Sequence, residues 1–242
     1  MTDAPPSELR ILAFGDLDGD VWGCAVDAGE RAIVFATPDG NGSATGAGTI
    51  SLDDDPSAWT VAGDGFELHA TPLAHDGIDA RAAGELCQVQ GTLTAAGTRR
   101  EVQCLGTRSE SDPRRVKRLR SARAISGWFS SDHGLALLAL RPDGGKGHES
   151  DLIDAIVFEP DGWIAVDEPR LSTTFRAGEQ PARASLELWI GEGEEQYQRR
   201  AAAEASGPGA TVDGAGISLQ VTPLRCHTGG LDGTGIYLLA RF

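Results

Sequence analysis

Several motifs that would mark common functional classes are missing from this chain of 242 residues. No run of about 18 apolar residues occurs, which argues against a membrane-spanning helix. The first residues contain neither the basic region nor the apolar region of a secretory signal, so we expect a cytoplasmic location. The four cysteines form no CxxC pair, and the sequence contains no HExxH, GxSxG or GK[ST] motif. We therefore expect no metal and no other cofactor, and no α/β-hydrolase or P-loop enzyme.

Positive charge is scarce, with 21 basic residues against 36 acidic ones and a net charge of −15. Such an acidic surface repels nucleic acid and anionic membranes, so we expect neither as a partner. The bases are concentrated in residues 111–123, which hold six of them and one acid. Asp112 followed by Pro113 suits the start of a helix, and we predict one or two helical turns at 113–121. This basic segment either neutralises its acidic surroundings or docks an anionic partner.

Alternating strand and helix units are not visible either, which makes an α/β enzyme fold unlikely. Short apolar or alternating segments are instead separated by Asp-Gly, Gly-Gly and Pro-Asp-Gly turns, as in antiparallel sandwiches and barrels. The strands predicted in this way cover residues 10–17, 21–27, 31–37, 48–52, 60–62, 66–74, 85–94 and 99–108, and then 124–130, 135–141, 152–159, 163–166, 170–176, 184–190, 197–205, 217–224 and 235–241.

Two blocks of sequence recur in the same order in the two halves of the chain. The tetrapeptide AIVF precedes Pro-Asp-Gly in residues 32–40 and again in residues 155–162. Residues 63–73 match residues 214–224 at six of eleven positions. Two ordered matches favour a duplicated β module. We therefore predict an N-terminal β-barrel module at 1–110, a basic linker at 111–123 and a C-terminal β-barrel module at 124–242.

A longer pattern points to a family. Residues 85–108 read ELCQVQGTLTAAGTRREVQCLGTR, and the second half opens with Gly127-Trp128-Phe129 and later contains Pro160-Asp161-Gly162-Trp163. This arrangement resembles the tandem lipocalin-like (calycin-like) β-barrel proteins related to carotenoid 1,2-hydratase and AttH. The resemblance implies an all-β fold of two tandem antiparallel barrels or half-barrels, joined here by a short basic helical linker. Relatives in that family include isoprenoid hydratases and cyclising or pericyclic enzymes of natural-product pathways, but no catalytic residue is carried over from them.

Two predicted hairpins bear on possible chemistry. A turn at residues 95–97 would place Cys87 opposite Cys104 on one apolar face, as buried thiols or as a disulfide or reactive pair. The acidic segment Asp16–Asp20 is spaced like the start of a calcium loop. Its sixth position is valine instead of the required glycine, so we interpret it as a hairpin turn at Asp18-Gly19.

The candidate acids are Asp132, His133 and His148, which lie in two predicted turns on either side of the strand at 135–141. A carboxyl group beside a histidine can act in general acid catalysis, although Asp132 and His133 also suit a surface turn. The candidate ligand-binding residues are four tryptophans, which would either fill the core or form a flat apolar wall for a polyene or polycyclic ligand. They are Trp22, Trp128, Trp163 and Trp189.

Three functions are compatible with this sequence. The first is binding of a small, largely apolar molecule, isoprenoid-like or polyketide-like, within a barrel or in the seam between the two halves. The second is a cofactor-free hydratase or cyclase that uses the candidate acids and the tryptophans. The third is an interaction module that docks an anionic partner through the basic linker. The sequence leaves the oligomeric state open, because edge strands can pair or be covered.

Overall fold

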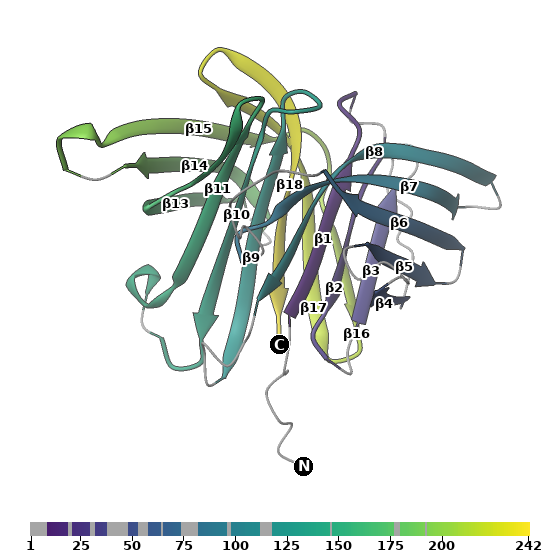
Figure 1. Cartoon of the computed structure of the whole chain (residues 1–242). Helices are drawn as coiled ribbons and strands as arrows, with labels where there is room; N and C mark the ends of the chain where they lie inside the picture. The colour runs from purple at the N-terminus through teal and green to yellow at the C-terminus, as the bar shows by residue number, and fades with distance from the viewer. Residues whose placement is uncertain are drawn as a thin grey trace.

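The protein consists of two curled antiparallel sheets, each a half-barrel (Figure 1). This prediction from the sequence is confirmed. The architecture comes from a computed structural model that describes residues 9–18, 21–29, 32–37, 48–52, 58–63, 65–73, 82–95, 98–111, 118–145, 147–176, 180–191 and 193–242. Among these residues, no helix has the length and apolar character that crossing a membrane requires.

The N-terminal sheet has eight strands in the order β3-β2-β1-β8-β7-β6-β5-β4. Its members are β1 (Leu9–Gly15), β2 (Trp22–Asp27), β3 (Ala32–Thr37), β4 (Gly48–Leu52), β5 (Trp59–Gly63), β6 (Phe66–Pro72), β7 (Glu85–Ala95) and β8 (Thr98–Ser111). Apolar and polar residues alternate along β6, which places Phe66, Leu68 and Ala70 inside the half-barrel and the residues between them in solvent.

The C-terminal sheet has ten strands, nine of them in the order β12-β11-β10-β9-β18-β17-β15-β14-β13, while β16 pairs with β17 off this path. Where the chain is described, two single-turn 3-10 helices lie between strands, namely η2 (His148–Ser150) and η3 (Gly193–Glu195). The strands are β9 (Leu119–Trp128), β10 (Gly134–Pro142), β11 (Leu152–Glu159), β12 (Gly162–Ala165), β13 (Glu168–Phe175), β14 (Pro181–Ile190), β15 (Tyr197–Ala205), β16 (Ala210–Gly214), β17 (Ile217–Thr228) and β18 (Leu231–Arg241).

The topology supports one of the two sequence repeats and corrects the other. The AIVF blocks lie on β3 and β11, which are each two strands away from the first strand of their half. The other pair of matched blocks lies on β6 and β17. The last strand of the N-terminal half is β8, and that of the C-terminal half is β18. The two blocks hold different places, because β17 adjoins β18 whereas β7 separates β6 from β8. Both of these blocks are tight turns that lead into a strand, with Gly65 and Gly216 at positive φ. Their similarity therefore reflects shared turn chemistry.

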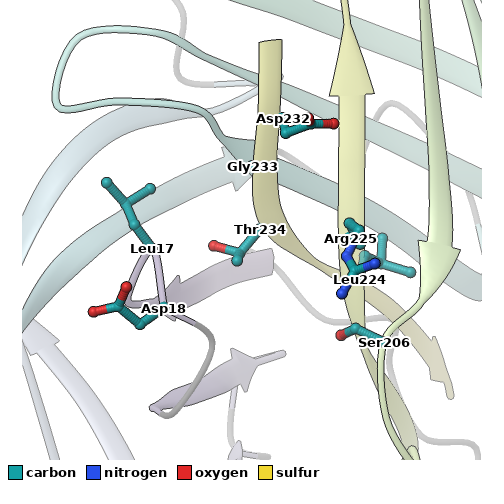
Figure 2. Close-up of a pocket in the computed structure, with 8 residues that line it drawn as sticks. All are labelled: Leu17, Asp18, Ser206, Leu224, Arg225, Asp232, Gly233 and Thr234. Atoms are coloured by element: carbon teal, nitrogen blue, oxygen red, sulfur yellow. The ribbon is translucent and has the colours of Figure 1, made fainter.

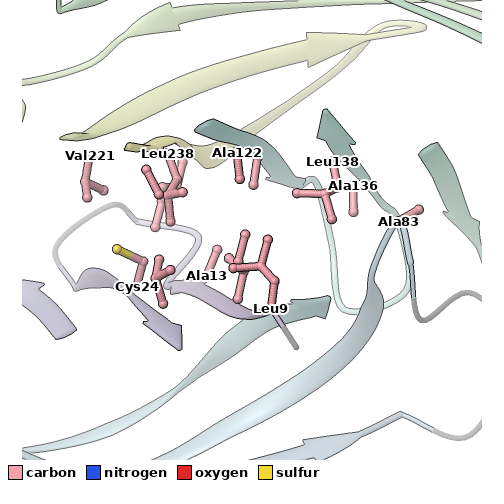
Figure 3. Close-up of a cluster of buried hydrophobic side chains, with 14 of the residues drawn as sticks. Leu9, Ala13, Cys24, Ala83, Ala122, Ala136, Leu138, Val221 and Leu238 are labelled. Carbon is pink, nitrogen blue, oxygen red and sulfur yellow. The ribbon is translucent and has the colours of Figure 1, made fainter. Parts of the chain in front are cut away.

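Among the described residues, three clusters of buried apolar side chains hold the molecule together. One cluster fills the N-terminal half-barrel and a second fills the C-terminal half-barrel. The third, which we call the seam core, packs the outer face of one sheet against that of the other (Figure 3). The seam core includes Leu9, Ile11, Ala13, Trp22 and Cys24 from β1 and β2, and Ala122, Trp128, Leu138, Val221 and Leu238 from β9, β10, β17 and β18.

The helix predicted at 113–121 is wrong for its last three residues. Residues 119–121 belong to β9, where Leu119 is buried and Ser121 pairs with both Arg141 and Arg241. Pairing with a strand on each side outweighs the local preference for a helix. Residues 113–117 lie outside the described part of the chain.

The hairpin of β7 and β8 differs from the predicted register by two residues. Ala95 pairs with Thr98, so Val89 faces Cys104 and Cys87 faces Gly106. A shift of two keeps every side chain on the same face, so both cysteines remain buried as predicted. All four cysteines are free thiols, and burial raises the pKa of Cys104 to about 12. Such thiols stay protonated near neutral pH and are poor nucleophiles.

Candidate functional site

An open groove of about 640 Å³ lies between the two halves of the molecule (Figure 2). One wall is the turn at Leu17 and Asp18, which follows β1 in the N-terminal half. The other wall comes from the C-terminal half, at the upper part of β17 and the start of β18. Its lining residues are Ser206, which follows β15, and Leu224, Arg225, Asp232, Gly233 and Thr234. We call this space the seam groove.

The N-terminal wall of the seam groove is held in place by Asp16. The backbone N–H of Asp16 donates to the carbonyl of Val21 at 2.9 Å, and the N–H of Val21 donates to Asp16 Oδ2 at 3.1 Å. The carbonyl of Asp16 also accepts a hydrogen bond from the Thr234 hydroxyl of β18 at 2.9 Å. Asp16 therefore closes the hairpin of β1 and β2 and ties it to the opposite wall. The turn predicted at Asp18-Gly19 includes Gly19, which lies outside the described residues.

The C-terminal wall carries most of the polar groups. Strand alternation leaves Leu224 buried and directs the neighbouring Arg225 to the exposed side of β17. Asp232 lines the groove, and its carboxylate lies 3.0 Å from His227 Nδ1. Leu17, by contrast, is an aliphatic side chain with 46% of its surface exposed. The groove thus combines apolar surface with hydroxyl, carboxylate and guanidinium groups.

Three of the four candidate tryptophans pack in the seam core. Trp22, Trp128 and Trp163 have at most 9% of their surface exposed. The rings of Trp163 and Phe158 meet edge to face with centroids 5.2 Å apart. Trp189 is half-buried on β14 and belongs to none of the three clusters of buried side chains. The three buried rings therefore fill the core, and they do not line the seam groove.

Asp132 and His133 form a compact polar turn between β9 and β10. The Ser130 hydroxyl donates to Asp132 Oδ1 at 2.6 Å, and His133 Nδ1 lies 3.0 Å from both Ser130 Oγ and Asp132 Oδ1. The hydrogen bond from Ser130, followed by that from His133, lowers the pKa of Asp132, which is exposed. Asp132 is therefore ionised near neutral pH and carries no proton to donate as a general acid. Ser130 and Asp132 both contact Nδ1 of His133, whereas in a Ser-His-Asp triad the serine and the aspartate contact different ring nitrogens.

His133 also lines a second, much smaller cavity of about 30 Å³ at one mouth of the C-terminal half-barrel. Phe129, Leu135 and Leu188 make its apolar surface, with Glu159 and Arg199 among its polar lining. His148, the third candidate acid, begins η2 beyond the other end of β10 and does not line this cavity. The structure therefore does not bring the three candidate acids into one site.

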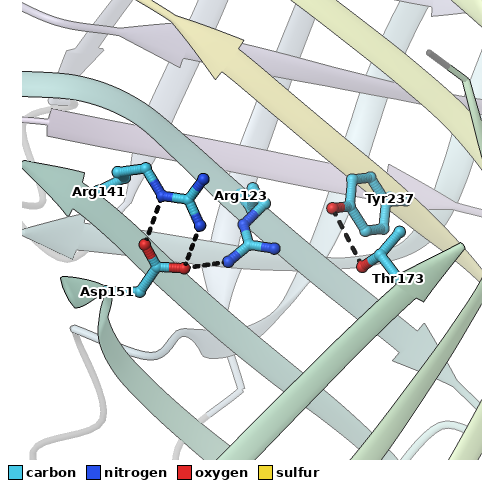
Figure 4. A network of polar contacts seen from close by, with 5 residues as sticks. All are labelled: Arg123, Arg141, Asp151, Thr173 and Tyr237. Carbon is cyan, nitrogen blue, oxygen red and sulfur yellow. Dashed lines mark hydrogen bonds and ion pairs between the residues drawn. The ribbon is translucent and has the colours of Figure 1, made fainter. Parts of the chain in front are cut away.

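The basic segment contributes a buried ion cluster inside the C-terminal half-barrel (Figure 4). Asp151 binds Arg141 through both oxygens, at 2.6 and 2.9 Å, and also pairs with Arg123, the last base of the segment. The hydrogen bond from Asp151 raises the pKa of Arg141. Arg118 and Arg120 are exposed, and residues 112–117 lie outside the described part of the chain. At least one of the six bases thus serves an internal ion pair.

The sequence did not identify the residues of the seam groove as candidate ligand-binding residues. The turn at Asp18 was predicted, but its neighbours in the groove lie about 200 residues later in the chain, and no local pattern predicts that contact. Across the described residues, no cluster of three or more histidine, cysteine or acidic side chains has the arrangement of a metal site.

Comparison with known proteins adds information on the fold alone. No family model matches the chain, and no curated protein matches it. Among solved structures, CghA with Sch210972 aligns with a TM-score of 0.64 and 11% identity over 97% of this chain and 88% of that one. A Nitrosomonas europaea protein named as a candidate AttH aligns with a TM-score of 0.53 and 13% identity, over 96% of this chain and 91% of that one. The chain has their fold. The resemblance inferred from the sequence is therefore confirmed at the level of architecture.

Proposed function

We propose that the protein binds a small, largely apolar molecule with polar substituents, and that the seam groove is its site. The observation that carries this proposal is a groove of about 640 Å³ whose two walls come from different half-barrels. Its volume falls within the range of about 300–1,000 Å³ that is usual for small-molecule sites. The structural neighbour CghA was solved with a small molecule, Sch210972, which supports a binding role for this fold.

The groove indicates how such a ligand would be oriented. Its carbon skeleton would cover the exposed face of Leu17, because removing apolar surface from water is favourable. Its polar substituents would meet Arg225 and Thr234 on the C-terminal wall. The seam core below is already filled by side chains such as Trp128, so we place the ligand in the groove and not between the sheets.

Binding is tested with Nile red, a neutral apolar dye whose fluorescence rises in an apolar site. We expect saturable binding that Leu17→Glu weakens at least about tenfold, since a charge replaces apolar contact surface. The matched control is Leu152→Glu, which changes a leucine that is 37% exposed on β11 and outside the groove. Equal effects of the two substitutions, or no saturable binding at all, would contradict the proposal.

The alternative is a cofactor-free hydratase or cyclase. It is favoured by the position of His133, which lines an apolar cavity and is oriented at Nδ1 by Asp132. In such a reaction, an imidazolium proton passes to one carbon of a double bond, and water or a second alkene captures the cation. The resulting oxonium ion or carbocation then loses a proton to the neutral imidazole, which restores the imidazolium. At about 30 Å³ the cavity holds no substrate, so the half-barrel mouth would have to open.

Catalysis is tested by incubating the protein with a polyene isoprenoid and measuring, by mass spectrometry, the gain of one water. His133→Gln is expected to reduce turnover by at least about a hundredfold, as general acids commonly contribute this much. His69→Gln is the control, because that histidine is exposed beside Glu67 on β6, in the other half-barrel, and does not line the cavity. Unchanged turnover in His133→Gln excludes this histidine as the acid.

A further inference from the structure

Strand β17 changes its partner part-way along its length. Residues Ile217–Val221 pair with β16, whereas Leu224–Thr228 pair with β15. Thr222 and Pro223 lie between the two ladders, where β15 and β16 diverge into different parts of the molecule (Figure 1). The backbone N–H of Ser206 reaches back to the carbonyl of Pro223 at 3.0 Å and fixes the point of divergence. We call this region the fork.

A cavity of about 340 Å³ opens at the fork, at the end of the C-terminal half-barrel opposite the His133 cavity. It is separate from the seam groove, with which it shares only Ser206 among the residues that line each. Its principal lining residues are Arg176, Gln180, Pro181, Ser206, Pro208 and Thr222.

Thr222 places an unsatisfied polar atom in this cavity. The residue is 2% exposed, and its hydroxyl oxygen is buried with no hydrogen-bond partner within the described residues. Gly209 passes so close that a Cβ there would lie 2.7 Å from this oxygen. Buried hydroxyl groups nearly always have a partner, because burial without one is unfavourable. Ser111 and Thr222 carry the hydroxyl groups in this state among the described residues, and Thr222 lines the fork cavity, which indicates a group that a ligand completes.

The lining defines the chemistry of that ligand. Arg176 is the one charged side chain among the described residues that line the cavity. Its guanidinium and the Thr222 and Ser206 hydroxyls are donors suited to a carboxylate. The rings of Pro181 and Pro208 offer apolar walls. We propose that the fork cavity binds the carboxylate of a small organic acid with a flat apolar body.

The probe is benzoate, compared with its neutral isostere benzamide, with binding followed through the amide NMR signals of Ser206, Gly207 and Gly209. We expect benzoate to bind at least tenfold more tightly than benzamide, since only benzoate carries the charge that Arg176 recognises. Thr222→Val and Arg176→Gln are each expected to weaken benzoate binding about tenfold. Equal affinities for the two probes, or signal changes confined to other parts of the molecule, overturn the proposal.

A second measurement separates a ligand-binding hydroxyl from a structural one. Without benzoate, Thr222→Val should leave the urea midpoint unchanged or raise it, because it removes an unpaired buried group. Thr228→Val is the matched control on the same strand, where the hydroxyl donates to the Arg200 carbonyl at 2.9 Å, and it should lower the midpoint. A lower midpoint in Thr222→Val would show that its hydroxyl is already satisfied. Leu17→Glu should leave benzoate binding intact. The experiments can therefore contradict the proposed site in the seam groove without contradicting the proposed carboxylate site at the fork, or the reverse.

Discussion

Replacing Asp151 by asparagine is expected to lower the free energy of unfolding by about 3 kcal/mol. The Asp151 side chain is fully buried, and it contacts Arg123 and Arg141, whose side chains are 7% and 25% exposed. Asparagine keeps the shape but removes the negative charge that both guanidinium groups share. Arginine stays protonated at any accessible pH, so the cluster cannot adapt by losing a proton. Urea denaturation with an unchanged m-value is the measurement.

The control for Asp151 is an ion pair on the surface. Arg183 and Glu204 lie 2.9 Å apart on neighbouring strands, with side chains 69% and 61% exposed. Glu204→Gln is expected to change the free energy of unfolding by less than about 1 kcal/mol, because water and salt screen exposed pairs. If the two substitutions had similar effects, the charge of Asp151 would not be what stabilises the inside of the half-barrel.

Trp128→Ala is expected to be at least as destabilising, by about 3–5 kcal/mol. Trp128 is 1% exposed in the seam core, and its ring packs so closely on Gly15 of β1 that a Cβ there would lie 3.3 Å from it. Truncation therefore leaves a cavity between the two half-barrels, which the surrounding strands cannot easily close. Thermal and urea unfolding measure the loss.

Two further tryptophan variants sharpen this test. Trp189→Ala should cost about 1 kcal/mol, because that ring is only half-buried and belongs to no cluster of buried side chains. Trp128→Phe should cost less than Trp128→Ala, since it keeps most of the ring and removes an indole N–H that is buried with no hydrogen-bond partner among the described residues. A small effect of Trp128→Ala would indicate that this side chain faces open space, as a ligand wall would.

Much of the fold can be predicted from the sequence, because turn residues separate strands whose apolar residues alternate. Every predicted strand overlaps an observed one, and Gly48–Leu52, Leu152–Glu159 and Tyr197–Ala205 have the predicted bounds. The omitted strand is β16, five residues that include a single large apolar side chain, Val212. Local propensity there is weak, and pairing with β17 determines the structure.

The candidate site is less predictable because it depends on contacts between distant parts of the chain. The sequence identifies tryptophans as apolar but cannot say which face of each sheet becomes the seam core. The same is true of Thr222, whose place between two ladders is a property of strand pairing. Asp132 and His133 could be placed in a turn from the residues around them, whereas the groove beside Leu17 required the arrangement of both half-barrels.

The position of β18 has a consequence for how the protein folds during synthesis. This strand lies in the middle of the C-terminal sheet, between β9 and β17, and Ile125 of β9 pairs with Tyr237 about 110 residues later. The ribosome therefore produces β9 to β17 before the strand that joins them exists. Until then, β9 and β17 each lack a partner along one edge, and their apolar residues are open to association with other chains. Such long-range pairing also predicts slow folding of this half.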